Sequence, residues 1–433
     1  MAEKVLILGL SKSGIAAAKF AASKGCDVYL TETKNEVNLE QVKELQNLGV
    51  KVEHGSHSEE FISGASFAVT SPGIPPKSEI FRRLNEKNIK IISEVEFAYL
   101  NTKTPFIAIT GTNGKTTTTA LVSHILSKKF SAPVCGNIGV PPTSLIEENH
   151  DFLVCEISSY QAQMTERFKA KIACWTNFTP DHIDWHGGLE NYFNAKAKIF
   201  LPPQEPEFAI LNAQDTKLKE FSKQCKNVIF FDDGNDCGIK NNSIFYKGEE
   251  IISLKDCPLV GHHNYQNIMC GIIIAKLVGM NNSDIREQIM SFRAPEHRLE
   301  KVREMNGITF FNDSKATNPE ASIVAIDSFN NQNVALILGG RDKNTDLTEM
   351  CHSINKHIKT VLLIGEATER FEENLKKNGF SNIIKEHTME DAIDKAISLK
   401  PDVVLLSPAC ASFDMFKSYE HRGEVFKDYV LSK

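Results

Sequence analysis

A chain of 433 residues is too long for one compact domain and suits two to four. Hydrophobic residues make up 41% and charged residues 24%, which is typical of a globular protein with substantial buried cores. The formal net charge of −6 excludes a general basic field for nucleic acid or anionic membranes, so anionic ligands must be met by local cations and backbone amides.

No stretch approaches the roughly 18 apolar residues of a membrane helix, and the first apolar run is too short for a signal peptide. The ten cysteines show neither C-x-x-C pairs nor zinc-site spacing. We therefore expect a cytoplasmic protein with reduced, mostly buried thiols.

One pattern recurs along the chain: a short aliphatic run ends in glycine or another small residue, and a helix-like segment follows. It lies at residues 4–14, 105–115, 334–344, 360–370 and 402–412. Such runs suit strands buried on both faces of a parallel sheet. We predict an α/β fold with three α/β domains, each with a mostly parallel sheet, over residues 1–93, 94–294 and 295–433. Polar joints at 99–105 and 292–298 separate them.

The first domain departs from the dinucleotide pattern G-x-G-x-x-G. Gly9 and Gly14 hold the outer positions, but Ser11 replaces the middle glycine. Glu32 ends the second strand-like run, where an acid would hold the ribose of a nicotinamide cofactor. A purely structural turn is equally compatible with this pattern, and Ser11 disfavours an NAD(P) oxidoreductase.

The middle domain opens on a phosphate-loop pattern. Residues 109–118 read ITGTNGKTTT, between a strand expected at 106–110 and an amphipathic helix. Gly111 and Gly114 allow close backbone approach, Lys115 supplies charge for terminal phosphates, and Thr116 or Thr117 offers a hydroxyl for Mg²⁺. Ile109 replaces the usual first glycine, so the loop is a variant. A plain glycine turn with a surface lysine is the alternative.

A carboxylate and a polar cluster follow this loop. The apolar run before Glu156 predicts a strand tip beside the loop, where the Mg²⁺ ligand of nucleotide enzymes lies. Asp181, His182 and Asp184 cluster in the next expected loop, and Lys196 lies on the helix after it. The alternatives are a solvated glutamate and a capped loop. Residues 223–251 alternate like strands and predict a small antiparallel addition to this domain.

The third domain places Lys315 just past an apolar run at 307–311. A solvated loop lysine is the alternative role for it. Cys410 lies among small residues and is expected to be a packed thiol.

Seven stretches together resemble the Mur ligases, which build the peptide of the bacterial cell wall. They are GTNGKTT, CEISSYQ, DHIDWHG with NYFNAKAK, GHHNYQN, HRLE, NDSKATNP and SPACASFDMFKSYEHRG, in the family's order over residues 105–426. The resemblance implies ATP-driven amide formation in which a carboxylate is phosphorylated and the acyl phosphate is attacked by an amine. It implies a Rossmann-like UDP domain, a P-loop ATPase domain and a Rossmann-like C-terminal domain.

Within the family, the stretches are most similar to the members that add D-glutamate to UDP-N-acetylmuramoyl-L-alanine. The resemblance thus implies these two small-molecule substrates, ATP and two Mg²⁺ sites. With the bulk composition, it leads us to expect a cytoplasmic monomer with no nucleic-acid or membrane partner.

The resemblance also implies roles for individual residues. Catalytic roles fall to Lys115, His182 and Lys196. ATP would be bound by Gly111, Thr112, Asn113, Gly114, Lys115, Thr116, Thr117, Asn267, Arg298 and Asp313. The metal ligands would be Thr116, Glu156, His182 and Lys196 as a carbamate. The UDP-substrate would be bound by Ser11, Lys12, Ser13, Glu32, Thr33, Lys34, Ser71, Gly73, Asn137, Ser158, Gln161 and His182. Glutamate would be bound by Lys315, Thr317, Lys343, Ser412, Phe413 and Tyr419.

Two alternatives stay open at this point. A sister ligase could add another amino acid, although the D-N-P-R stretch of the diaminopimelate- or lysine-adding enzymes is missing from the sequence. A nucleotide-binding regulator on the same fold would need no amino-acid pocket. Lys196, His182, Lys315 and Ser412 disfavour it.

Overall fold

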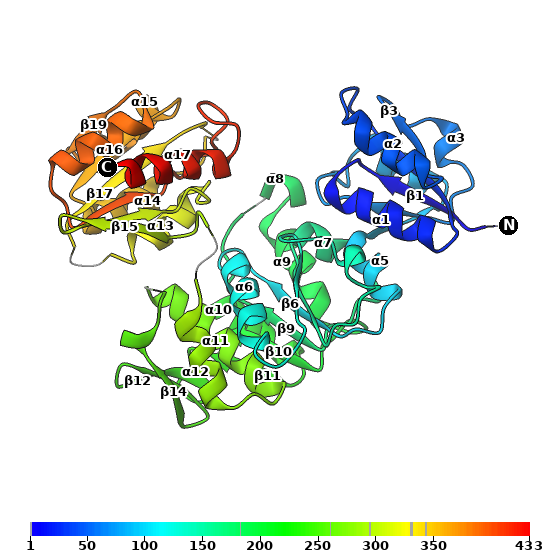
Figure 1. Ribbon diagram of the computed structural model, residues 1–433, viewed down its shortest axis with the longest axis horizontal. Coiled ribbons are helices and arrows are strands. Elements are labelled where there is room, and N and C mark those ends of the chain that lie inside the picture. The colour runs from blue at the N-terminus through cyan, green and yellow to red at the C-terminus, as the bar shows by residue number, and fades with distance from the viewer. Residues whose placement is uncertain (1, 182, 260, 294–295, 330–331, 343) are drawn as a thin grey trace. The chain divides into compact units, whose positions relative to one another are not determined.

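The computed structural model describes residues 2–181, 183–259, 261–293, 296–329, 332–342 and 344–433. The chain forms two compact units, Met1–Cys257 with Gln266–Ser291, and Pro258–Tyr265 with Phe292–Lys433. Two sheets lie in the first unit and one in the second (Figure 1). These sheets confirm the predicted α/β class. The boundaries at 93/94 and 294/295 stay predictions.

The first sheet, drawn in blue in Figure 1, is fully parallel. Its order is β3-β2-β1-β4-β5. The strands are β1 Lys4–Leu8, β2 Asp27–Glu32, β3 Lys51–His54, β4 Phe67–Thr70 and β5 Lys90–Ser93, and the helices are α1 Lys12–Ser23, α2 Leu39–Asn47, α3 Glu59–Ile62, α4 Glu79–Glu86 and α5 Glu94–Leu100. Four consecutive β1 residues, Val5 to Leu8, are fully buried because helices cover both faces of a parallel sheet. The strand order reverses between β1 and β4, and ligands bind at such a switch point.

The second sheet has nine strands in the order β14-β13-β12-β11-β10-β9-β6-β8-β7. The strands are β6 Phe106–Thr110, β7 Val134–Gly136, β8 Leu153–Glu156, β9 Ile172–Trp175, β10 Phe208–Asn212, β11 Val228–Phe231, β12 Cys237–Lys240, β13 Ser243–Tyr246 and β14 Glu249–Ser253. The helices are α6 Lys115–Leu126, α7 Ser159–Gln163, α8 Ile183–His186, α9 Leu189–Ala197, α10 Thr216–Phe221, α11 His262–Leu277 and α12 Asn282–Ser291. The strand predicted at 106–110 is confirmed, and β12, β13 and β14 form the antiparallel addition predicted over 223–251, whereas β11 in the same segment pairs in parallel with β10.

The two sheets of the first unit share one continuous apolar core, from Val5 in β1 to Phe221 in α10. A polar contact reinforces the connection. Glu94, at the start of α5, accepts hydrogen bonds from the backbone N (2.7 Å) and Oγ1 (2.6 Å) of Thr143. Burial raises the pKa of Glu94 to about 7. The carboxyl ends of the first sheet are therefore held beside the segment that follows β7.

The sheet of the second unit has the order β15-β16-β20-β17-β18-β19 and is parallel except for β15 against β16. The strands are β15 Glu300–Met305, β16 Ile308–Asn312, β17 Val334–Gly339, β18 Thr360–Ile364, β19 Ile383–Lys385 and β20 Val403–Leu406. The helices are α13 Pro319–Ile326, α14 Thr348–His357, α15 Thr368–Lys377, α16 Met389–Ser398 and α17 Tyr419–Ser432.

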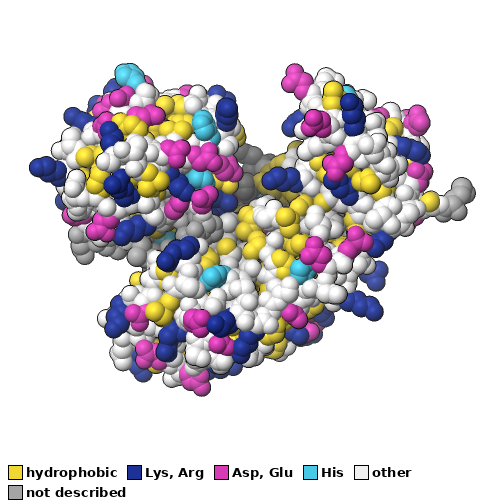
Figure 2. Space-filling view, in the orientation of Figure 1, with side chains coloured by type: hydrophobic (Ala, Val, Ile, Leu, Met, Phe, Trp, Pro, Cys, Tyr) yellow, Lys and Arg dark blue, Asp and Glu magenta, His cyan; other side chains and the backbone are white. Residues whose placement is uncertain are grey.

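The distribution of surface charge and the state of the cysteines agree with what the composition predicts. Acidic and basic side chains are interspersed over the face drawn in Figure 2. The ten cysteines are free thiols, and seven of them are buried. Within the described part of the chain, no helix combines the length and apolarity needed to cross a membrane.

Candidate functional site

The phosphate loop connects β6 to α6, and its glycines are required by close contacts. Gly111 has φ +150°, and a Cβ there would lie 1.9 Å from Oγ1 of Thr176. Gly114 has φ +82°, and a Cβ would lie 2.7 Å from Oδ1 of Asn267. Since the first N–H groups of a helix have no acceptor within the helix, the start of α6 at Lys115 has the N–H donors that the predicted phosphate site requires.

Lys115 folds back over this loop. Its Nζ donates hydrogen bonds to the carbonyl oxygens of Gly111 (3.0 Å) and Thr112 (2.8 Å). The neighbouring Thr116 and Thr117 are buried at the first turn of α6. Asn267, from α11, accepts a hydrogen bond of 3.0 Å from Thr118 and so holds α11 against the loop helix.

The carboxylate of Glu156 lies at the end of β8, which pairs with β6 so that Glu156 is opposite Ile109. The side chain is 1% exposed. Its Oε1 accepts a hydrogen bond of 2.8 Å from Nδ2 of Asn137, and its Oε2 has no partner among the described residues. A buried carboxylate oxygen without a partner is costly unless a cation neutralises it. With the hydroxyl of Thr116 it fits the hard oxygen donors that Mg²⁺ prefers.

A second metal position has less support. The described residues hold no group of three or more His, Cys, Asp or Glu side chains able to bind a metal. His182 lies outside the described residues. The sequence predicts a loop at residues 183–186, but these four residues form one helical turn, the short helix α8.

Lys196 is buried beneath the phosphate loop, with 1% of its surface exposed. Its Nζ donates a hydrogen bond of 2.8 Å to the Gly111 carbonyl, and it lies 4.9 Å from the ring centroid of Tyr192. Burial, and then the charge of Lys115, hold the pKa of Lys196 well below its usual range. The neutral amine is therefore accessible. Lys198 instead donates to the Gln163 carbonyl at 2.9 Å.

Two residues beside the loop were missed from the sequence. Thr176 closes on Gly111 and donates a hydrogen bond of 2.6 Å to the Asn113 carbonyl. The hydroxyl of Tyr192 lies 3.1 Å from Oγ1 of Thr112. Tyr192 belongs to the first turn of α9 and to the stretch NYFNAKAK that resembles the family, but its contact with Thr112 was missed because the two residues are 80 positions apart in sequence.

A cavity of about 640 Å³ opens at the carboxyl ends of the first sheet. Nine of the residues predicted to bind the UDP-substrate line it: Ser11, Lys12, Ser13, Glu32, Thr33, Lys34, Ser71, Gly73 and Asn137. Ser158 and Gln161 are not in its lining, and instead they form the capping box that begins α7. The structure thus gathers most of this predicted set in one place, and whether these residues bind substrate stays a prediction.

The start of α1 forms one wall of this cavity. Ser11 is its N-cap residue, accepts a hydrogen bond of 3.3 Å from the Gly14 backbone, and lies 2.7 Å from Oγ of Ser71. Gly14 is required because a Cβ would lie 2.0 Å from the Gly9 carbonyl oxygen. The glycine pattern of the first domain therefore serves close packing of the turn, and it leaves a helix N-terminus facing the cavity.

Glu32 is held by the backbone around it. Its Oε2 accepts from the Leu10 amide at 3.0 Å, and its Oε1 from the Lys34 amide at 3.1 Å. Burial opposes ionisation, but these hydrogen bonds outweigh it and the pKa of Glu32 is lowered. The carboxylate thus stays charged and fixes the shape of the cavity rim.

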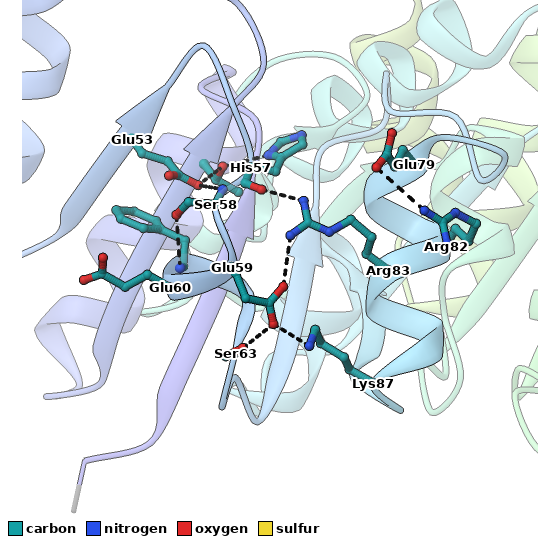
Figure 3. Close-up of polar contacts among 12 residues, drawn as sticks. Glu53, His57, Ser58, Glu59, Glu60, Ser63, Glu79, Arg82, Arg83 and Lys87 are labelled. Carbon is teal, nitrogen blue, oxygen red and sulfur yellow. Dashed lines mark hydrogen bonds and ion pairs between the residues drawn. The ribbon is translucent and has the colours of Figure 1, made fainter.

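His57 also lines the cavity and was missed from the sequence. Its Nδ1 lies 2.7 Å from Oγ1 of Thr31, which also donates to Glu53 at 2.7 Å. Arg83 donates to the His57 carbonyl at 2.5 Å and pairs with Glu59 at 3.1 Å (Figure 3). Burial lowers the pKa of His57. This network connects the β3–α3 loop to β2 and α4.

In the second unit, Asp313 follows β16 and is buried. Its Oδ2 accepts from Oγ of Ser407 at 2.8 Å, and its Oδ1 from the Leu299 amide at 3.1 Å. Burial raises the pKa of Asp313 to about 7, although the hydrogen bond from Ser407 and the charge of Arg298 oppose this rise. The structure therefore brings two of the predicted ATP-binding residues, Asp313 and Arg298, into electrostatic contact.

Two of the predicted glutamate residues, Lys315 and Ser412, lie on loops that Arg422 connects through Ser314 and the Ala411 carbonyl (3.4 Å). The buried Arg422 side chain donates to Oγ (2.9 Å) and to the carbonyl oxygen (2.8 Å) of Ser314. Nζ of Lys315 lies 5.5 Å from the ring centroid of Tyr419. Arg422 lies within the stretch SPACASFDMFKSYEHRG that resembles the family, but its role was missed because its partner Ser314 is distant in sequence.

The remaining predicted glutamate residues differ in their surroundings. Ser412 is buried, whereas Phe413 is 63% exposed. Thr317 lies on the same loop as Lys315, between β16 and α13. Lys343 lies outside the described residues. Binding of glutamate by this set stays a prediction.

Comparison with known proteins gives matches along most of the chain. Residues 3–93 match the Mur ligase MurD-like N-terminal domain, residues 109–275 the Mur ligase middle domain, and residues 297–410 the Mur ligase glutamate ligase domain. The chain is 37% identical over 446 residues to the UDP-N-acetylmuramoylalanine--D-glutamate ligase of Caldanaerobacter subterraneus subsp. tengcongensis, covering 99% of this chain and 98% of that one. It is 39% identical over 443 residues to the ligase of the same name from Koribacter versatilis, covering 99% and 97%.

Solved structures share the fold at lower identity. UDP-N-acetylmuramate-alanine ligase MurC from Thermotoga maritima matches with a TM-score of 0.62 and 20% identity, covering 99% of this chain and 100% of that one. MurF from Acinetobacter baumannii matches with a TM-score of 0.63 and 17% identity, covering 99% and 93%.

Proposed function

The chain belongs to the Mur ligase family, and on that premise we propose that it is the ATP-dependent ligase that joins D-glutamate to UDP-N-acetylmuramoyl-L-alanine in peptidoglycan synthesis. Relatives that carry this activity in their names cover nearly the whole chain. The proposal assigns UDP-substrate binding to residues 1–93, ATP binding to 94–294 and amino-acid binding to 295–433. It also includes use of ATP with Mg²⁺, and a monomeric protein.

The observation that supports this function best is the pair of lysines at the phosphate loop. Nζ of Lys115 and Nζ of Lys196 both donate to the Gly111 carbonyl, at 3.0 and 2.8 Å. The first step brings a carboxylate to a phosphate, so two anions must meet. Positioning and charge neutralisation then supply most of the catalysis. Lys115 supplies positive charge directly, whereas Lys196, whose lowered pKa favours the neutral amine, would contribute through the cation that its carbamate holds.

The reaction has two steps, phosphorylation of the carboxylate and formation of the amide. An oxygen of the L-alanine carboxylate attacks the γ-phosphorus of ATP, the bond to the β-phosphate oxygen breaks, and ADP leaves. The amine of D-glutamate then attacks the acyl carbon and loses a proton, and the tetrahedral intermediate collapses to the amide and phosphate. Bound Mg²⁺, held by Thr116 and Glu156, would supply further positive charge at the phosphates.

The chain's own residues bind and orient the reactants in this scheme. The N-terminus of α1 at Ser11 receives the pyrophosphate of the UDP-substrate, and the N-terminus of α6 receives the phosphates of ATP. Lys315 pairs with a carboxylate of D-glutamate as a charge-assisted contact.

Product analysis tests this function against its alternatives. The purified protein is incubated with ATP, Mg²⁺, UDP-N-acetylmuramoyl-L-alanine and one of four amino acids: D-glutamate, L-glutamate, L-lysine or meso-diaminopimelate. Mass spectrometry should find the extended UDP-peptide with D-glutamate alone. A product with another amino acid would identify a sister ligase, and no product with any of them would favour a nucleotide-binding regulator.

A further inference from the structure

Asn137 connects two parts of the first unit that the proposed reaction needs. It lines the 640 Å³ cavity at the end of the first sheet. Its Nδ2 donates a hydrogen bond of 2.8 Å to Oε1 of Glu156. One side-chain amide therefore lies between the space for a sugar nucleotide and the carboxylate beside the phosphate loop.

The backbone holds this contact in register. β7 and β8 are parallel, with Gly136 opposite Glu156, and the Asn137 amide donates to the Glu156 carbonyl at 2.9 Å. Gly136 has φ +100°, and a Cβ there would lie 2.2 Å from the Glu156 carbonyl oxygen. Only glycine permits this approach, so the Asn137 side chain starts from a fixed position next to Glu156.

The hydrogen bond orients a carboxylate that is otherwise uncompensated. Glu156 is 1% exposed, and its Oε2 has no protein partner within the described ranges. With Oε1 fixed by the amide, Oε2 is the oxygen left for a cation. A hydrogen bond to an ionised group is stronger than one between neutral groups, so it restrains the carboxylate effectively.

Asn137 keeps capacity for a ligand. A primary amide has two N–H donors and a carbonyl oxygen that accepts two hydrogen bonds. Glu156 takes one N–H, and no other side-chain bond of Asn137 is found among the residues that the structure describes. The residue is exposed at the cavity. Its remaining N–H and its Oδ1 match the amide and carboxylate groups at the acyl end of a sugar-nucleotide substrate.

We propose that Asn137 is a positioning residue that couples binding of the sugar-nucleotide substrate to binding of Mg²⁺ with ATP. The substrate fixes the amide, and the amide fixes Glu156 in the orientation that presents Oε2 to the cation. This inference rests on the proposed function, because that function supplies both ligands.

The coupling should be positive and reciprocal. Each ligand restrains side chains that the other would have to order at an entropic cost. Because coupling is a free energy shared by the two sites, each ligand must tighten the other by the same factor. Couplings of this kind are typically about fivefold or more, and we expect at least about fivefold here.

Calorimetric titration tests this inference without turnover. The affinity of the whole chain for Mg²⁺ with a non-hydrolysable ATP analogue is measured with and without UDP-N-acetylmuramoyl-L-alanine, and the reverse titration is then made. Wild-type protein should show equal tightening in both orders. In Asn137→Ala, the affinity for each ligand should be nearly the same with and without the other ligand.

Ser78→Ala is the matched control. Ser78 lines the same cavity, and its buried Oγ has no partner within the described chain, so it does not hold Glu156. This variant should keep the coupling even if its substrate affinity changes. Undiminished coupling in Asn137→Ala, or none in the wild type, would overturn the inference. Failure of wild-type protein to bind the UDP-substrate at all would instead overturn the proposed function.

Discussion

Replacing Lys196 by alanine should remove most of the ligase activity and leave the fold intact. The Lys196 side chain is 1% exposed, and its Nζ reaches the Gly111 carbonyl at 2.8 Å. Burial and the charge of Lys115 lower its pKa, which favours the neutral amine. In the modification that the family resemblance implies, the neutral amine would form a C–N bond to CO₂ and release a proton, giving an anionic carbamate whose oxygens suit Mg²⁺.

The expected size of the effect comes from the position of this group. At pH 7, the neutral amine makes up roughly one molecule in 2,500 of a lysine with the ordinary pKa of about 10.4. Each unit by which the pKa is lowered raises this neutral fraction tenfold. Loss of one preorganised group where charge develops typically costs about 10²–10³ in kcat. We therefore expect kcat of Lys196→Ala to fall at least about 100-fold. Its stability should change by less than about 3 kcal/mol, since two hydrogen bonds are lost, one to the Gly111 carbonyl and a longer one, of 3.5 Å, to Oγ1 of Thr110.

The assay is ADP formation at saturating substrates, with and without added formate or acetate. A short carboxylate can occupy the space of the carbamate and should restore part of the activity of Lys196→Ala. Lys198→Ala is the matched control, because the Lys198 pKa is also lowered by burial but its Nζ faces Gln163. Full activity in Lys196→Ala, or equal loss in Lys198→Ala, would refute the reasoning.

Four further predictions concern other residues and the two units. Lys115→Ala should abolish ADP formation with little change in melting temperature, and an unaltered rate would contradict the phosphate-loop assignment. Lys315→Ala should raise KM for D-glutamate or lower kcat by roughly 10–100-fold, which corresponds to the free energy of one charge-assisted hydrogen bond, without altering affinity for the UDP-substrate. If the variant loses only affinity for the UDP-substrate, Lys315 is misassigned. Burial raises the pKa of Glu94 to about 7, so the folded wild-type protein binds this proton more tightly than the unfolded chain does, and its unfolding free energy should fall on the order of 3 kcal/mol as the pH rises from about 4.5 to 7. Glu94→Gln should not show this fall. Urea titrations with the same pH slope in both proteins would refute the prediction. Small-angle scattering should show a more compact particle with ATP analogue and UDP-substrate, since Lys115 and Lys315 belong to different units, and identical profiles would argue against closure.

The phosphate loop could be predicted from the sequence because its information is local. Gly111, Gly114 and Lys115 lie within five residues between a strand and a helix, and the structure places β6 and α6 there. The antiparallel strands after residue 236 were likewise visible as alternation with turn residues.

The parts that could not be predicted depend on contacts between distant segments. His57 reaches the cavity because β3 pairs with β2 and brings its loop to Thr31, 26 residues away in sequence. Arg422 is buried because Ser314, 108 residues away, satisfies its guanidinium. Ser158 and Gln161 show the opposite case, since their spacing also fits a local capping box and the structure forms it.

Release of inorganic phosphate tests the central claim most directly. The rate is measured with ATP and Mg²⁺ alone, then with UDP-N-acetylmuramoyl-L-alanine, with D-glutamate, and with both. We predict sustained release only when both substrates are present, with one phosphate released for each UDP-peptide formed. Sustained release that needs neither substrate, or that continues without D-glutamate at the full rate, would contradict the assignment of this chain as the D-glutamate-adding ligase.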